Sequence, residues 1–176
     1  MGEKELRDLI PIQAEWSIPQ LQENLAVALE GSGAALSTTQ TQTKQVANEV
    51  ALVVNTSGST GDSKSVVLSS AALIASANAS HKYLGATPGD SWSLLLPTTH
   101  IAGLNVIVRA TALGSRVIDN RNTENYVDAD FVSIVPTQLY KALTSDSKLL
   151  EHLTAAEAVL VGGAPLSDKL KKEAAS

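Results

Sequence analysis

The sequence has 176 residues, 44% of them hydrophobic, so it can bury the core of one domain. Its 18 acidic and 13 basic residues give a net charge of -5, and because they include no cluster of lysine and arginine, nucleic acid is not an expected partner. Neither disulfides nor thiolate metal sites can form without cysteine, and no apolar run approaches the roughly 20 residues of a membrane span, so we expect a cytoplasmic protein with no membrane partner.

The first expected element is a helix. Ser17 can cap it, Pro19 suits its first turn, and Gly31 ends it after one apolar face has been completed. A polar connector is expected over residues 37–45. The valine-rich residues 46–54 then predict a buried strand.

Strand-like and helix-like segments alternate over the rest of the chain. A short strand is predicted over residues 65–68, and Ser69 or Ser70 can cap the alanine-rich helix that ends at Gly85. Further strands are predicted at residues 91–96, 116–118, 130–135 and 158–161. Helices are predicted at residues 101–113, 137–143 and 147–153. This order indicates an α/β fold with a largely parallel sheet flanked by helices.

A loop of small and polar residues, ending in Lys64, follows the valine-rich strand. Its glycines permit positive φ and its hydroxyl groups and lysine can surround phosphate oxygens, although the same composition is typical of a plain connector. The Walker A pattern fits at Gly58, Lys64 and Ser65 but has Ser63 in place of its second glycine. Because paired valines follow, we expect a strand after the loop, which is the wrong context for a P-loop.

The segment TSGSTGDSK, residues 56–64, resembles the signature of the adenylate-forming enzymes, a superfamily that contains acyl-CoA synthetases, luciferases and peptide-synthetase adenylation domains. Their signature has proline where this chain has Ser63 and glycine where it has Ser65. The resemblance implies that the loop holds the β- and γ-phosphates of ATP. The residues concerned are Thr56, Ser57, Gly58, Ser59, Thr60, Gly61 and Lys64.

A second segment, LLLPTTHIAGLNVIVRATALGSRVI, resembles the P-x-x-H-x-x-G region of this superfamily, with Pro97, His100 and Gly103 in register. It is most similar to the o-succinylbenzoate:CoA ligases of menaquinone biosynthesis, in which the following apolar helix bears an arginine, here Arg109. The resemblance implies that His100 borders the acyl and CoA sites and that Gly103 and Arg109 belong to the substrate region. By residue type alone, His100 fits a helix cap, and Arg109 can pair with an internal carboxylate, reach solvent or steer an acidic substrate.

The third segment, AVLVGGAPLSDKL, is a strand followed by a glycine-containing turn and a capped helix. Open α/β sheets bind ligands at the carboxyl ends of their strands, where this turn would lie. The resemblance implies that four residues of the turn lie beside the adenine ring: Gly162, Gly163, Ala164 and Pro165. The segment FVSIVPTQLYKAL, residues 131–143, also resembles the family and is interpreted as scaffold.

Residues 1–45 are interpreted as a leading helix and connector, and residues 46–176 as the α/β core of a partial N-terminal AMP-binding domain. The family's C-terminal domain and its adenylation lysine are not in the sequence, so we expect a piece of a longer ligase that is inactive alone. The intact enzyme would use ATP, Mg2+ and CoA to convert a carboxylic acid to its thioester. No residue here is assigned a certain catalytic role, His100 is the one candidate at the acyl and CoA site, and no residue is assigned as a metal ligand. Alternatives are another acyl- or aryl-CoA ligase, a non-catalytic nucleotide-binding module, or an interaction domain; the oligomeric state, a homo-oligomer included, is left open.

Overall fold

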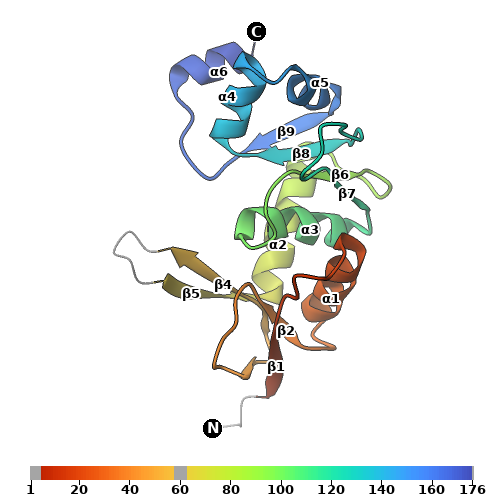
Figure 1. Cartoon of the computed structure of the whole chain (residues 1–176). Helices are drawn as coiled ribbons and strands as arrows, with labels where there is room; N and C mark the ends of the chain where they lie inside the picture. Colours follow the sequence, from red (N-terminus) through yellow and green to blue (C-terminus); the bar gives the residue numbers. More distant parts are fainter. Residues whose placement is uncertain (1–4, 58–62, 176) are drawn as a thin grey trace.

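The structure is a computed structural model that describes residues 5–57 and 63–175 (Figure 1). The described elements are β1 (Leu6–Pro11), α1 (Ile18–Glu30), β2 (Ala35–Ser37), β3 (Gln45–Ala47), β4 (Val50–Ser57), β5 (Ser63–Ser69), α2 (Ser70–Leu84), β6 (Trp92–Leu94), α3 (Ile101–Leu113), β7 (Val117–Asp119), β8 (Phe131–Ile134), α4 (Pro136–Thr144), α5 (Ser147–Ala155), β9 (Ala158–Val161) and α6 (Asp168–Ala174). Strands and helices alternate over most of the chain, so the predicted α/β class is confirmed.

The strands form two sheets. The first has the order β3-β1-β2-β4-β5, with parallel pairs in its centre and antiparallel strands β3 and β5 at its edges. The second has the order β7-β6-β8-β9 and is parallel throughout. Most pairs are therefore parallel, as predicted, although they are divided between two sheets.

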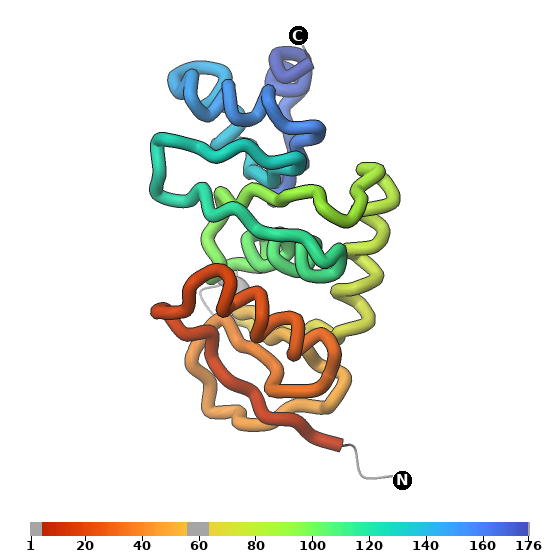
Figure 2. Tube along the Cα trace, turned by 90° about the vertical axis from the view of Figure 1, so that its right-hand side faces the viewer, coloured from red at the N-terminus to blue at the C-terminus, as the bar shows by residue number. Residues whose placement is uncertain are grey.

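Helices α1, α2 and α3 lie between the two sheets, as Figures 1 and 2 show together. One hydrophobic core runs through this layer, and it includes Leu52 of the first sheet, Leu104 of α3 and Phe131 of the second sheet. Helices α4, α5 and α6 cover the other face of the second sheet with a separate cluster that includes Val132 and Leu153. The second sheet is thus covered on both faces, which parallel sheets require.

The β4–β5 hairpin confirms the predicted strand after the small polar loop. The two strands are antiparallel, with Val54 opposite Val66 and Thr56 opposite Lys64. Valines favour this extended backbone because their branched side chains crowd a helical turn. Since a P-loop needs a helix beginning at the lysine, the structure contradicts a modified P-loop module.

One prediction near the N-terminus is wrong, and two strands there were missed. The single strand expected over residues 46–54 is two strands, β3 and β4, separated by a turn at Asn48 and Glu49. The Asn48 amide donates a hydrogen bond to the carbonyl of Glu5, so the turn brings β3 beside β1. Strands β1 and β2 were not predicted, because β1 mixes charges with its apolar residues and β2 is only three residues long.

The predicted helix ends are confirmed. Ser17 and Gln20 form a capping box at the start of α1, and Gly31 ends it with a φ of 79°. At α2, Ser69 rather than Ser70 is the N-terminal cap, and Gly85 ends the helix with a φ of 71°. Local hydrogen bonds and left-handed glycines therefore set these boundaries.

Candidate functional site

A pocket of about 380 Å³ opens at the carboxyl ends of β8 and β9, against α3. Its walls are mostly apolar, and its polar lining groups come from Asn105, Arg109 and Ser133 and from the turn at Gly162 and Gly163. Pockets at the carboxyl ends of parallel strands are the usual ligand sites of open α/β sheets. The fold therefore brings two of the three predicted motif segments, around Arg109 and around Gly162, to one place.

Arg109 projects from α3 to the pocket. Its Nε donates a hydrogen bond to the Ser80 hydroxyl at 3.3 Å, and its guanidinium carbon lies 5.7 Å from the centre of the Trp92 ring. In the described part of the chain Arg109 pairs with no carboxylate, so the internal ion pair considered from the sequence is not present there. Burial lowers the pKa of the guanidinium, which nevertheless stays charged at neutral pH.

Gly103 positions α3 against the strand that precedes it. It is buried, and a Cβ atom at this position would lie 2.3 Å from the carbonyl oxygen of Pro97. The first turn of α3 can thus approach the segment after β6 only through a glycine. Gly103 does not line the pocket itself, whereas its neighbours Ile101 and Ala102 do.

His100 is the N-terminal cap residue of α3, but its exposed side chain makes no capping hydrogen bond. It is not among the residues that line the pocket at β8 and β9. Its position beside acyl and CoA sites therefore stays a prediction.

The turn after β9 places only its two glycines at the pocket. The Gly162 amide donates to the Ile134 carbonyl and so extends the pairing of β9 with β8, and Gly163 has a φ of 85°. Ala164 and Pro165 are exposed on the same turn and do not line the pocket. Their role beside an adenine ring stays a prediction.

The residues expected to hold phosphates belong to the β4–β5 hairpin. Gly58, Ser59, Thr60 and Gly61 lie outside the described residues, and of Thr56 and Ser57 the structure describes the backbone, which belongs to β4. Lys64 lies on β5 with an exposed side chain. In Figure 1 the hairpin and the turn after β9 project on the same side of the molecule, from different sheets.

Two polar residues of the pocket were not predicted from the sequence. Ser133, on β8, is buried, and its hydroxyl has no hydrogen-bond partner among the described residues. Asn105 precedes Arg109 by one helical turn and shares its face of α3. A four-residue spacing of polar residues on an apolar helix was the available signal for Asn105, and a lone serine in an apolar strand was the signal for Ser133.

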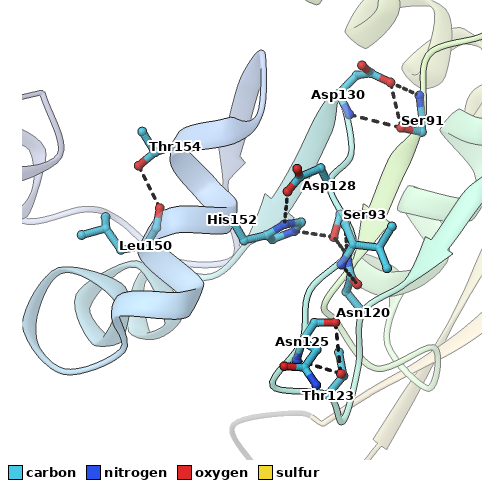
Figure 3. Close-up of polar contacts among 11 residues, drawn as sticks. Ser91, Ser93, Asn120, Thr123, Asn125, Asp128, Asp130, Leu150, His152 and Thr154 are labelled. Atoms are coloured by element: carbon cyan, nitrogen blue, oxygen red, sulfur yellow. Dashed lines mark hydrogen bonds and ion pairs between the residues drawn. The ribbon is translucent and has the colours of Figure 1, made fainter.

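A second polar group has the residues of a hydrolase triad (Figure 3). The Nε2 of His152 lies 2.9 Å from the Ser93 hydroxyl, and its Nδ1 lies 4.0 Å from a carboxylate oxygen of Asp128. Ser93 is fully buried on β6 and accepts a further hydrogen bond from Asn120, so no substrate can reach its oxygen. Burial lowers the pKa of His152, which favours a neutral, structural histidine that ties α5 to β6.

Metal and membrane features were also sought in residues 5–57 and 63–175. No three or more histidine, aspartate or glutamate side chains within these ranges are grouped so that they could hold a metal ion. No helix there combines the length and the apolar character needed to cross a membrane.

The fold defines an α/β protein with a pocket at the carboxyl ends of a parallel sheet and a separate antiparallel hairpin. A model of the AMP-binding enzyme family matches residues 4–176. The chain belongs to the AMP-binding enzyme family.

Relatives and a solved structure agree with this assignment. The chain is 41% identical over 135 residues to the "Probable 2-succinylbenzoate--CoA ligase" of Mycobacterium tuberculosis H37Rv, covering 69% of this chain and 34% of the relative. It is 32% identical over 169 residues to the 2-succinylbenzoate--CoA ligase of Salmonella typhimurium, covering 89% of this chain and 36% of the relative. The O-succinylbenzoate coenzyme A synthetase of Bacillus subtilis in complex with AMP shares the fold, with a TM-score of 0.60 at 22% identity over 94% of this chain and 51% of that one. The chain spans about a third of the length of the two curated relatives.

Proposed function

We propose that this chain supplies the acid-binding and nucleotide-binding part of an AMP-forming acid:CoA ligase whose acid is 2-succinylbenzoate. The observation that carries the proposal is Arg109, a half-buried cation that lines an apolar pocket and pairs with no carboxylate of the described residues. A cation withdrawn from water without a protein counter-charge is well placed to bind an anionic ligand. The names of the Mycobacterium and Salmonella relatives support the choice of acid.

The acid has two carboxylates, and only one of them reacts. Arg109 would bind the other through the two terminal nitrogens of its guanidinium, while the apolar walls formed by α3, β8 and β9 would surround the aromatic ring. Asn105 offers a further hydrogen bond inside the pocket. This division of roles would leave the reacting carboxylate free to face the nucleotide.

In the first half-reaction the free carboxylate attacks the α-phosphorus of ATP. Pyrophosphate departs, and an acyl-adenylate is formed. Lys64 and the loop from Thr56 to Gly61 would hold the β- and γ-phosphates, and the turn at Gly162 and Gly163 would lie beside the adenine. Mg2+ would offset charge on the triphosphate and take its oxygens mainly from the phosphates, since the described residues offer no three-ligand cluster. The CoA thiol then displaces AMP in the second half-reaction.

A binding experiment tests the proposal without requiring turnover, and we expect little turnover from a chain about a third as long as its relatives. Calorimetric titration with 2-succinylbenzoate should show binding that Arg109→Gln weakens by about tenfold or more, because a charge-assisted hydrogen-bonded pair is lost. Arg121→Gln, at a cation already paired with Asp119, is the matched control and should bind as tightly as the wild type. Equal affinity of the Arg109→Gln variant would overturn the proposal.

The apolar walls of the pocket favour a second candidate, a ligase for an aryl acid with one carboxylate. This second candidate would be favoured if benzoate bound more tightly than 2-succinylbenzoate and if Arg109→Gln did not change the affinity for benzoate.

A further inference from the structure

Helix α2 holds Arg109 from outside the pocket. Two consecutive residues of α2 contact it: the Ser80 hydroxyl accepts the hydrogen of Nε at 3.3 Å, and the Nε2 atom of His81 lies 3.0 Å from the Arg109 carbonyl oxygen. One contact concerns the side chain and the other the backbone. Together they fix both the backbone and the side chain of Arg109 to a neighbouring helix.

The direction of each hydrogen bond is determined. The Ser80 hydroxyl donates its own hydrogen to the Ser76 carbonyl at 3.0 Å, so toward Arg109 it can only accept. A carbonyl oxygen has no hydrogen, so Nε2 of His81 carries the hydrogen that it donates to Arg109. Neither contact can reverse, because a guanidinium nitrogen cannot accept a hydrogen bond and a carbonyl oxygen cannot donate one.

The rest of the guanidinium is left for a ligand. Its central carbon lies over the Trp92 ring, 5.7 Å from the ring centre, and the centre of the Trp92 ring is 6.0 Å from that of the His81 ring. The two terminal nitrogens of Arg109 make no hydrogen bond within the described residues, whereas Nε is occupied by Ser80. A guanidinium held at Nε still presents its two terminal N–H groups as a fork to one carboxylate.

We propose that Ser80 is a positioning residue for Arg109, with His81 as its backbone anchor, and that both orient the guanidinium toward the acid before the acid binds. Pre-orientation strengthens binding because less side-chain freedom is lost when the complex forms. The ligand part of this inference rests on the proposed function, while the orientation of Arg109 does not. The acids concerned are those with a carboxylate remote from the reacting one.

Nuclear magnetic resonance of the whole 15N-labelled chain tests the orientation directly. The Nε–Hε signal of Arg109, assigned by its loss in Arg109→Lys, should exchange with water about threefold to tenfold faster in Ser80→Ala, because the acceptor is removed. Ser80→Thr keeps a hydroxyl at the same place and should restore the wild-type rate. Ser76→Ala, an exposed serine one turn earlier on the same helix, is the matched control and should leave the rate unchanged.

Titration of the same samples with 2-succinylbenzoate and benzoate tests the consequence for binding. Ser80→Ala should weaken 2-succinylbenzoate about threefold to tenfold and leave benzoate unchanged, with rescue by Ser80→Thr. If the Arg109 signal and the 2-succinylbenzoate affinity are both unaltered in Ser80→Ala, the positioning role is overturned. If the signal responds but the wild type binds no acid, the positioning stands and the proposed function fails.

Discussion

A Cβ atom on Gly103 would lie 2.3 Å from the carbonyl oxygen of Pro97 and 2.8 Å from that of Leu96. Both neighbours are backbone atoms, so no rotation of a side chain can make room. Helix α3 therefore packs directly against the segment that follows β6.

We expect Gly103→Ala to lower the free energy of unfolding by about 1–3 kcal/mol, the usual cost of overpacking, although alanine favours a helix over glycine by about 1 kcal/mol. Urea denaturation measures the change. Gly162→Ala is the control for stability, because a Cβ there meets nothing within 4 Å. An unchanged urea midpoint for Gly103→Ala would contradict this prediction, because it would mean that α3 and the segment after β6 can move apart at little cost in free energy.

Ser133 and Ser93 form a matched pair of buried serines on the neighbouring strands β8 and β6. Within residues 5–57 and 63–175 the Ser133 hydroxyl has no hydrogen-bond partner, so Ser133→Ala should leave the free energy of unfolding within about 0.5 kcal/mol of the wild type or raise it. Ser93→Ala removes the hydrogen bonds that the Ser93 hydroxyl makes with His152 and Asn120, and it should lower the free energy of unfolding by about 1–3 kcal/mol. Thermal denaturation of the two variants measures this difference. Equal losses of stability in Ser133→Ala and Ser93→Ala would contradict the prediction.

His152 should make stability depend on pH. Burial lowers its pKa in the folded state, so below its ordinary value of about 6.5 the unfolded chain takes up protons first. Stability therefore falls as pH drops from about 6.5 toward the lower folded pKa, and His152 contributes no dependence above that range. The buried His81, whose pKa is also lowered by burial, adds a loss of the same sign.

Unfolding in urea at pH 7.5 and pH 5.5 measures this dependence. His152→Gln should show a smaller loss between the two pH values than the wild type, whatever its stability at pH 7.5, because one proton-binding difference is removed. An equal loss in His152→Gln and in the wild type would contradict this role of His152. Three carboxyl groups have lowered pKa values in the folded state, those of Asp119, Asp130 and Asp146. Their contributions to the free energy of unfolding are lost only below about pH 4, outside the range from pH 5.5 to 7.5.

Arg7 closes the carboxyl end of α1. It is buried on β1, and two of its guanidinium nitrogens donate to the Ala28 carbonyl at 3.0 Å, one of them also to the Asn48 carbonyl at 3.3 Å. Arg7→Met keeps much of the volume but removes the guanidinium hydrogen bonds to both carbonyls. The Ala28 carbonyl then keeps only the longer contacts from the Gly31 amide at 3.3 Å and the Ser70 hydroxyl at 3.4 Å, so the change should cost about 1–3 kcal/mol. Arg121→Met, which breaks the partly exposed pair with Asp119, should cost less than about 1 kcal/mol by the same urea measurement. Equal costs for the two would refute this account of Arg7.

Much of the secondary structure could be read from the chain because its signals are local. The helix predicted over residues 101–113 is α3, and the caps at Ser17 and Ser69 and the ends at Gly31 and Gly85 depend on hydrogen bonds to residues within a few positions. The antiparallel hairpin at β4 and β5 was likewise predictable, from valines that favour extended backbone. The motifs near Arg109 and Gly162 identified the family for the same reason, since each is a short contiguous segment.

By itself, then, the sequence determined the α/β class, the helix boundaries, the strand after the small polar loop and the family. Only the tertiary structure decided that the strands divide into two sheets, that Asn48 separates β3 from β4, and that Ser133 and Arg109 share a pocket. It also decided that, within the described part of the chain, the Arg109 side chain donates to Ser80 rather than to a carboxylate. The reason is physical: caps and turns are formed by neighbours along the chain, whereas strand pairing, burial and the partner of a charged side chain depend on segments that only folding brings together.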